Sequence, residues 1–375
     1  MQDLIAHYID RILAQSTPQA PLWDMEKTRQ GSAPRWNYVD GCMMTSLLSL
    51  YEQTGEERFF RFVEHFIDYY VSEDGSMLSY ALETYNLDNI CEGRVLFDLY
   101  RATGKEKYRR AIALLHRQLT GQPLTTEGNF WQKLIYPHQV WLDGLYMAQV
   151  FAVRYENAFA QEPNYTDIVR QFQNVRDIMF DQEKKLYYHR YDSAKRMFWA
   201  NEKGLSKSFW LRAVGWFAVA LVDVISYLPQ SAKEERAQLS MLLNELIEGI
   251  VPYINEDTNM LYQVVNQAER EGNYPETSGS SMIAYAMLKG ARRGALPVQY
   301  RATGTLIFEG ICRKYLSEKD GMLNLGGICL SAGLGPENNN KRDGTYEYYI
   351  AEPVLENDAK GAAPFLMCYV ELQAI

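Results

Sequence analysis

The segment TGEERFFRFVEHF, residues 54–66, has a weaker copy further along the chain, TGKEKYRRAIALLHRQL, residues 103–119. In both segments a Thr-Gly pair precedes a run in which apolar residues recur every three or four positions. These positions are Phe59, Phe62, Val63 and Phe66 in the first segment, and Tyr108, Ile112, Leu115 and Leu119 in the second. Such spacing places the apolar residues on one face of a helix, so both segments are predicted to be amphipathic helices.

Four further segments complete this amphipathic set. Residues 168–180, 238–254 and 300–315 match the first two in style, and an opening helix is predicted over residues 4–13. With the two helices above, these make six amphipathic helices, each suited to lie on the outside of a helical core.

A second kind of helix alternates with the first. It is more apolar and richer in small residues, and it is predicted at residues 41–50, 89–100, 144–153, 213–225, 280–288 and 361–370. Six alternations of an outer and an inner helix indicate a closed toroid of helix pairs, an all-α (α/α)6 barrel. No linker rich in Pro, Ser or Gly divides the chain, so residues 1–375 are expected to form one catalytic domain.

The composition narrows the class of protein. The chain has 375 residues, with 38 Lys and Arg against 47 Asp and Glu, for a formal net charge of −9. An acidic chain lacks the basic face of a nucleic-acid-binding protein, and 47% hydrophobic residues exclude disorder as the main state. The aromatic content of 13% serves either a core or a sugar-stacking surface.

The sequence also predicts the compartment. The five cysteines are scattered and form no Cys-x-x-Cys pair, which argues against a zinc site or a disulfide framework. Residues 1–8 lack a basic region followed by an apolar run, so no signal peptide is expected. The longest apolar window, 209–228, contains Arg212 and Asp223, which favours a buried helix over a membrane span. We therefore expect a cytoplasmic protein that does not bind membranes.

Aromatic residues and carboxylates recur in the loops before the inner helices, at 36–40, 85–89, 130–143, 206–216, 274–278 and 342–358. In a toroid these loops meet at one mouth. The chain has no glycine-rich phosphate loop, no Ser/His/Asp order and no His-x-x-x-His metal pair. A cleft built from carboxylates and aromatic rings is typical of carbohydrate chemistry.

Each candidate residue also has a structural interpretation. Asp88 and Asp143 precede inner helices, where Asp is a good N-cap, although two of them at one aromatic mouth favour chemistry. His189 alone would be a structural loop residue. Trp141, Trp210 and Trp216 are equally suited to a core.

Arg212 is harder to explain by packing. It lies in an otherwise apolar helix, and a buried cation needs a carboxylate partner from the protein or from a substrate.

Several motifs resemble the unsaturated rhamnogalacturonyl hydrolases of glycoside hydrolase family 105. They are FWQK at 130–133 with Tyr136-Pro137, WLDGLYMA at 141–148, LYYH at 186–189, FWLRAVGW at 209–216, and the tail from Arg342-Asp343-Gly344 to Gly361. The likeness extends over nearly the whole chain in register. It implies an (α/α)6 barrel and a substrate whose non-reducing end is a 4,5-unsaturated galacturonate, usually linked to rhamnose. No metal or organic cofactor is implied.

The resemblance also implies roles for single residues. Asp143 matches the general acid/base of the family, and Asp88 matches a position that lines the sugar subsite; both are predicted to be catalytic residues. The predicted substrate-binding residues are Tyr38, Gln132, Lys133, Trp141, His189, Trp210, Arg212, Trp216 and Tyr346. The chain departs from the family at Gln132, where His is expected. That position is expected to touch the sugar, so the departure bears on substrate preference.

The chemistry of an unsaturated uronate sets requirements for these residues. A carboxylic acid protonates C4 of the enol ether, water adds at C5, and the resulting hemiketal opens and releases the glycosidic bond. Asp143 is expected to start protonated, with its pKa raised by burial among aromatic rings and by the nearby Asp88 carboxylate. Arg212 and Lys133 are expected to offset the substrate carboxylate.

Three alternatives remain open from the sequence. The first is an unsaturated glucuronyl hydrolase acting on another uronide. The second is an epimerase-like α/α-barrel isomerase, which would require several histidines at the mouth. Only His138 and His189 are candidates for these positions. The third is a sugar-binding protein without catalysis. The oligomeric state is not predicted.

Overall fold

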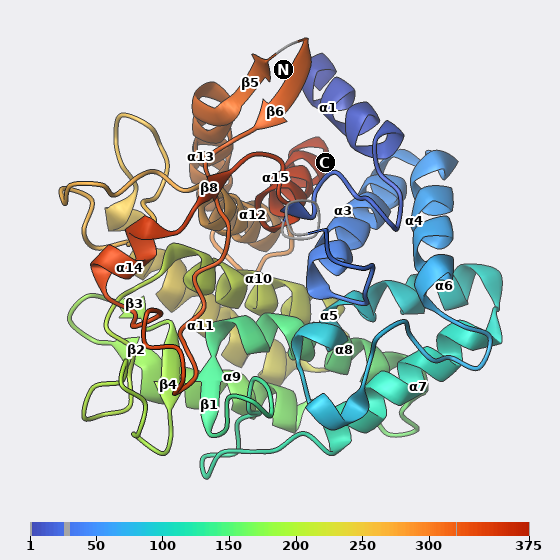
Figure 1. The fold of residues 1–375 in the computed structure, drawn as a ribbon, viewed down its shortest axis with the longest axis horizontal. Helices are drawn as coiled ribbons and strands as arrows, with labels where there is room; N and C mark the ends of the chain where they lie inside the picture. The colour runs from blue at the N-terminus through green and yellow to red at the C-terminus, as the bar shows by residue number, and fades with distance from the viewer. Residues whose placement is uncertain (1, 26–30, 320, 375) are drawn as a thin grey trace.

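The computed structural model describes residues 2–25, 31–319 and 321–374 of the chain, and it is built from two rings of helices (Figure 1). The inner helices are α3 (Tyr38–Thr54), α5 (Asp88–Glu92) with α6 (Arg94–Thr103), α8 (Leu142–Phe159), α10 (Leu211–Tyr227), α12 (Thr277–Arg292) and α15 (Ala359–Gln373). The outer helices are α1 (Gln2–Ala14), α4 (Glu57–Tyr70), α7 (Glu106–Thr120), α9 (Thr166–Met179), α11 (Lys233–Ile250) and α13 (Tyr300–Tyr315).

The inner helices close into a ring. Helix α10 packs against α8 and α12, α12 packs against α15, and α15 packs against α3, which contacts α5 beside α8. The colour gradient in Figure 1 follows this path around the centre from the N-terminus to the C-terminus. The predicted (α/α)6 barrel is therefore confirmed.

The outer helices bury the apolar stripe that their sequence spacing predicted. In α4 the buried residues are Phe59, Val63, Phe66, Ile67 and Tyr70, which recur at helical intervals. In α7 they include Tyr108, Ile112, Leu115 and Leu119. The opposite faces of these helices carry charged residues, so each outer helix covers the inner ring with one side only.

Helix α10 is the most completely buried of the inner helices. Its residues from Leu211 to Ile225 are all buried, including Arg212 and Asp223. Asp223 accepts hydrogen bonds from the Tyr285 hydroxyl and the Lys289 ammonium at 2.8 and 2.7 Å, so this buried carboxylate is paired. Within the described part of the chain, no helix combines the length and apolarity that crossing a membrane requires.

The few strands are short and lie in the loops. Strand β1 (Gln139–Trp141) pairs antiparallel with β4 (Arg190–Asp192), so that Trp141 is directly opposite Arg190. The remaining pairs are β2 (Phe180–Asp181) with β3 (Leu186–Tyr187), β5 (Leu316–Lys319) with β6 (Met322–Leu325), and β7 (Ile328–Cys329) with β8 (Val354–Leu355). A 3-10 turn η1 (Leu82–Thr84) and a short helix α14 (Tyr346–Ala351) complete these loops, and a second turn, η2 (Val251–Tyr253), follows α11.

Candidate active site

A cavity of about 190 Å³ lies where the loops before the inner helices meet. It is lined by Arg35, Tyr38, Asp88, Lys133, Tyr136, Trp141, Asp143, Met147, Arg190, Trp210, Arg212, Trp216, Ser331, Gly333 and Arg342. The fold thus brings together both predicted carboxylates with six of the nine predicted substrate-binding residues. We call this the catalytic cavity.

Asp88 is the first residue of α5, and its carboxylate is held by two neighbours from one loop. Oδ1 accepts a hydrogen bond from Gln132 Nε2 at 2.7 Å, and Oδ2 lies 2.5 Å from the Lys133 ammonium. The N-cap position of α5 belongs to Leu87, which makes no side-chain cap bond. Asp88 is therefore a paired carboxylate at the cavity rather than a helix cap.

Gln132 lies behind Asp88 instead of lining the cavity. Gln132 is 1% exposed, and its side chain occupies space that is open because Gly144 has no side chain. A Cβ added at Gly144 would lie 2.5 Å from Gln132 Oε1. The Gln132 amide thus acts on the site through Asp88.

Asp143 stands on the first turn of α8, which follows β1 directly. The N-cap of α8 is Trp141, without a side-chain cap bond. The Oδ2 atom of Asp143 lies 3.5 Å from His189 Nε2, and His189 Nδ1 lies 2.7 Å from the Tyr349 hydroxyl. His189 is fully buried, so this histidine supports Asp143 from behind and does not line the cavity.

The pKa of Asp143 differs from the sequence-based expectation. Burial raises it, but contact with His189 and the positive charge of Arg190 outweigh burial and hold the pKa below its ordinary value. Asp88 is neutralised by Lys133 and therefore does not provide the expected upward shift. The expected increase in the pKa of Asp143 was wrong for the free protein. The expectation included burial but not the positive charge of Arg190 on the neighbouring strand β4.

Arg190 is a buried cation without a carboxylate within ion-pair distance in the described residues. It is fully buried, Nη1 donates to the Leu334 carbonyl at 2.6 Å, and Nε has no partner there. Its guanidinium carbon lies 2.9 Å from the ring centre of Trp141. Burial lowers the pKa of Arg190 to about 10, so the guanidinium remains charged at neutral pH.

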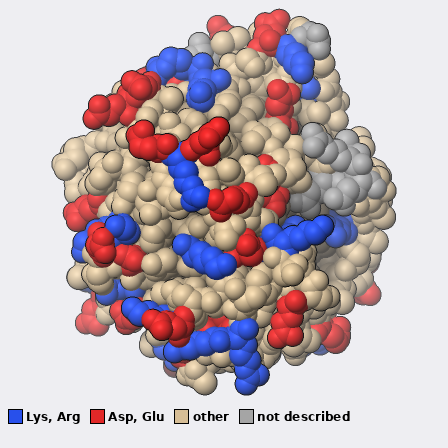
Figure 2. All heavy atoms as spheres, turned by 60° about the vertical axis from the view of Figure 1, so that its left-hand side comes forward, with Lys and Arg blue, Asp and Glu red and all other residues tan. Residues whose placement is uncertain are grey.

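Arg342 approaches the same point of the cavity as Arg190. A Cβ at Gly333 would lie 3.2 Å from Arg190 Nη2 and 3.4 Å from Arg342 Nη1, so the two guanidinium groups converge on this glycine. Arg35 adds a third cation to the lining. The whole chain is acidic, and Figure 2 shows basic and acidic side chains interspersed on the face it displays. The catalytic cavity thus gathers several cations although the chain as a whole is acidic.

Arg212 lines the cavity, but its donors are engaged by the protein. Nε donates to Ser278 Oγ at 2.7 Å, and the two terminal nitrogens donate to the carbonyls of Leu330 and Cys329. Nη2 also lies 3.5 Å from the buried Glu276 carboxylate. The predicted need of this buried cation for a carboxylate is thus met within the protein.

The three predicted tryptophans form walls of the cavity and are nearly buried. Trp141 is 7% exposed, and Trp210 and Trp216 are each 3% exposed. Trp210 packs against His189 at 4.7 Å between ring centres, and Trp216 stacks on Tyr146 at 4.2 Å. These contacts fix the ring orientations of Trp210 and Trp216.

Tyr38 lines the catalytic cavity, whereas Tyr346 does not. The Tyr346 hydroxyl donates to the carbonyls of Arg270 and Glu271 at 2.9 and 3.0 Å, and its ring lies 4.0 Å from the Arg270 guanidinium. It anchors α14 to the loop that precedes α12 instead.

Three cations and one hydroxyl were missed by the sequence reasoning: Arg35, Arg190, Arg342 and Tyr349. A signal was present for Arg190, which directly follows the LYYH motif, and for Arg342, which begins the tail segment quoted above.

A second hollow of about 370 Å³ adjoins the first. Arg35, Tyr38, Asp88 and Lys133 line both, so the two form one groove that extends from the carboxylates toward the loop at residues 79–89. The smaller part suits one sugar ring, and the larger part has room for the remainder of a short oligosaccharide.

A ring of helix pairs with carboxylates and tryptophans at its mouth is the architecture of an α/α-barrel enzyme that acts on sugars, a glycoside hydrolase. The family model described as Glycosyl Hydrolase Family 88 matches residues 8–375. The chain belongs to this family.

Individual relatives agree with this assignment. A Clostridium acetobutylicum glycoside hydrolase from family 105 is 37% identical, with a TM-score of 0.89 over 98% of this chain and all of that one. The unsaturated rhamnogalacturonyl hydrolase YesR of Bacillus subtilis is 22% identical over 68% of this chain and 71% of its own. A heparin-specific unsaturated glucuronyl hydrolase shares the fold, with a TM-score of 0.67 and 17% identity over the whole of this chain and 96% of that one. The resemblance to family 105 is confirmed.

Proposed function

We propose that the protein hydrolyses unsaturated rhamnogalacturonan oligosaccharides and releases the 4,5-unsaturated galacturonate from their non-reducing end. The observation that carries this proposal is that two carboxylates line one small cavity together with Arg190 and Arg342, which form no ion pair with the described acidic residues. A neutral sugar needs no such cations, whereas a uronate carries a carboxylate that does. The 22% identity to a rhamnogalacturonyl hydrolase supports the rhamnose-linked substrate. We place this activity in the cytoplasm and in pectin degradation.

Arg190 and Arg342 bind the uronate carboxylate in this proposal. Both line the cavity, both approach Gly333, and neither forms an ion pair with an acidic residue in the described part of the chain. A guanidinium presents two parallel N–H donors that match the two oxygens of a carboxylate. Arg212, which the sequence suggested for this role, shapes the cavity floor because its donors are already engaged.

The reaction begins with transfer of a proton to C4 of the enol ether. Asp143 supplies this proton, and positive charge develops at C5 and the ring oxygen. Water then adds at C5 while the Asp143 carboxylate removes its proton, so the residue ends protonated as it began. The product at C5 is a hemiketal, which opens and releases the aglycone. Asp88, held by Gln132 and Lys133, is the second carboxylate facing the developing charge.

Substrate binding supplies the protonated Asp143 that this mechanism needs. In the free protein Arg190 helps to hold the pKa of Asp143 low. A bound uronate neutralises Arg190 and brings another negative charge close to Asp143. Both changes favour the protonated carboxylic acid, so the proton is taken up with the substrate.

The adjoining hollow holds the aglycone in this proposal. It continues from Asp88 and Lys133, and its lining includes Trp36 and Asn86. A ring linked to the uronate would leave the catalytic cavity in this direction.

The activity is tested by following the ultraviolet absorbance of the conjugated C4–C5 double bond. The protein is incubated with lyase-digested rhamnogalacturonan and with single unsaturated disaccharides. Loss of absorbance on rhamnose-linked uronides is the expected result. If the absorbance of every unsaturated uronide stays constant, the proposal is wrong.

The main alternative is the same chemistry on glycosaminoglycan fragments, which the fold shared with a glucuronyl hydrolase keeps open. Rates on rhamnose-linked and amino-sugar-linked disaccharides separate the two activities. An isomerase of the epimerase type has less support, because the residues that line the catalytic cavity include no histidine among those described.

A further inference from the structure

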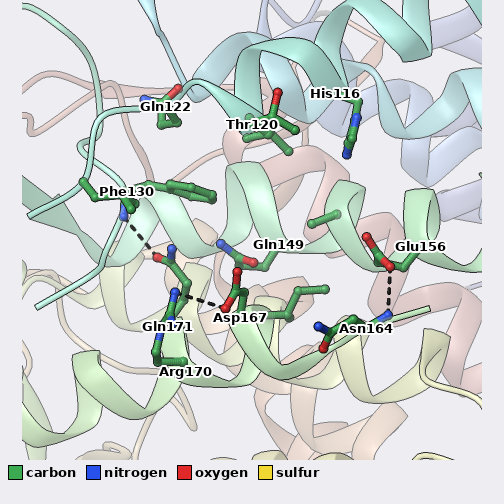
Figure 3. Close-up of a pocket in the computed structure, with 14 residues that line it drawn as sticks. His116, Thr120, Gln122, Phe130, Gln149, Glu156, Asn164, Asp167, Arg170 and Gln171 are labelled. Carbon is green, nitrogen blue, oxygen red and sulfur yellow. Dashed lines mark hydrogen bonds and ion pairs between the residues drawn. The ribbon is translucent and has the colours of Figure 1, made fainter. Parts of the chain in front are cut away.

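A separate cavity of about 340 Å³ lies between the outer helices α7 and α9 and the inner helix α8 (Figure 3). None of its lining residues belongs to the catalytic cavity. Its walls come from the C-terminal end of α7, the loop that follows α7, the middle of α8 and the start of α9. We call it the side cavity.

The floor of the side cavity carries a buried amide without a partner. Gln149, on α8, is 2% exposed, and its side chain makes no hydrogen bond within the described part of the chain. Figure 3 shows it in the middle of the cavity, between Phe130 and Glu156. The amide lines the cavity, so its donor and acceptor are available to a ligand bound there.

The other two buried glutamines of the side cavity, Gln122 and Gln171, form hydrogen bonds with the protein. Gln122 Nε2 donates to the carbonyls of Tyr85 and Trp131, each at 2.8 Å. Gln171 Oε1 accepts from Phe130 N at 3.1 Å, and Nε2 donates to the Gly128 carbonyl at 3.2 Å. These two amides hold loops in place, whereas the Gln149 amide faces open space.

The chemistry around Gln149 selects a neutral ligand with hydroxyl groups. An amide offers a donor and an acceptor side by side, as two neighbouring hydroxyls of a sugar require. Asp167 is paired with Arg170 at 3.1 Å, so Glu156 leaves the lining with an excess negative charge that disfavours uronates. Burial lowers the pKa of His116, which keeps its imidazole neutral.

The remaining walls suit the carbon face of a sugar ring. Leu119 and Ile168 are buried beside Gln149, and Phe130 contributes an aromatic ring. Apolar walls with a few convergent polar groups are the usual composition of a small-molecule site, and the volume lies in the usual range.

We propose that the side cavity is a second ligand site, which binds one neutral saccharide ring through the Gln149 amide. The proposal goes beyond the hydrolysis above and does not depend on it, because the two cavities share no residue. A ligand there would contact Phe130, which precedes the residues that hold Asp88 by only two positions. A ligand bound in the side cavity would therefore act on the loop that carries Gln132 and Lys133.

The test is saturation-transfer NMR with the methyl glycosides of rhamnose, galactose and glucose on the full chain. We expect at least one of them to bind with a dissociation constant in the millimolar range. Gln149→Met keeps the size of the side chain but removes the amide, and it should weaken binding about tenfold. Ala152→Phe should abolish binding, because Ala152 lines the cavity and a phenyl ring would fill it.

The matched control is Gln173→Met. Gln173 lies on α9, where its Nε2 donates to Gln238 Oε1 at 3.0 Å, and it does not line the side cavity. This variant should bind the sugars as the wild type does. Wild-type binding by either cavity variant would overturn the proposal, and so would the absence of binding by all three glycosides.

A measurement on the wild-type protein alone covers the case in which a variant fails to fold. The sugar that binds should slow amide hydrogen exchange in peptides that span residues 116–130 and 164–171. Unchanged exchange in both peptides would overturn the proposal independently of the variants.

Discussion

His189 Nε2 lies 3.5 Å from Asp143 Oδ2, and neither atom has a hydrogen-bonding partner among the described residues. The low pKa of Asp143 keeps its carboxylate ionised, so Oδ2 can act only as an acceptor toward His189 Nε2. His189 Nδ1 is then an acceptor, and the Tyr349 hydroxyl, whose pKa burial keeps far above its usual value, donates to it at 2.7 Å. The proton of the neutral imidazole is therefore on Nε2, where it faces Asp143. Tyr349 and His189 together fix the orientation of the Asp143 carboxylate.

The buried histidine predicts how stability depends on pH. Burial and the Arg190 charge lower the pKa of His189 from 6.5 to about 4. Between pH 6.5 and about 4, His189 binds a proton in the unfolded chain but stays neutral in the folded protein. The free energy of unfolding is therefore greatest above pH 6.5 and decreases by about 3 kcal/mol, from this group, as the pH falls toward 4. Denaturant unfolding at a series of pH values measures this slope.

The matched variants for this measurement are His189→Asn and His65→Asn, the latter at an exposed position on α4. His189→Asn should flatten the slope between pH 6.5 and 4, whereas His65→Asn should retain it. An unchanged slope in His189→Asn would contradict the neutral buried histidine.

Asp143→Asn removes the proposed acid and base while keeping the shape of the side chain. The turnover number on an unsaturated disaccharide should fall by about a hundred- to ten-thousand-fold, the usual contribution of general acid–base catalysis. Asp257→Asn, at an exposed position outside both cavities, is the control and should keep the wild-type rate. A folded Asp143→Asn variant with full activity would remove Asp143 from this role.

Arg212→Gln is expected to act mainly on stability. The variant leaves the fully buried Glu276 without its cation, and breaking a buried pair costs about 3–5 kcal/mol. Arg58→Gln, which removes an exposed pair with Asp10, should cost less than about 1 kcal/mol. Guanidinium unfolding measures both values, and similar values would refute the structural role of Arg212.

The sequence predicted the helices better than the contacts between them. The apolar spacing of residues 54–66 and 103–119 depends on local geometry, and so the double ring followed from the pattern. The partner of Arg212 could not be predicted from this pattern, because Glu276 lies in the loop before another inner helix and meets Arg212 only in the closed ring. The pKa of Asp143 was misjudged for the same reason: Arg190 reaches it through the pairing of β1 with β4.

Arg190→Lys tests the proposed recognition of the uronate. Lysine keeps the charge but loses the two parallel donors, so KM should rise about ten- to a hundredfold while kcat changes less. Arg196→Lys, at an exposed position on the same loop, should leave KM unchanged. Steady-state kinetics on an unsaturated disaccharide separate the two constants. An unchanged KM in Arg190→Lys would assign the uronate to another cation of the cavity.

Gly144→Ala tests whether Gln132 acts through Asp88. The new Cβ would lie 2.5 Å from Gln132 Oε1, so the amide must swing away and lose its hydrogen bond to Asp88. We expect kcat to fall about tenfold, the value of one hydrogen bond to a charged group, without loss of helix stability. The control is a double-mutant cycle with Gln132→Ala, which removes the clash. If the effect passes through Gln132, the double variant should be no slower than Gln132→Ala alone; additive losses would show that Gly144 affects the site by another route.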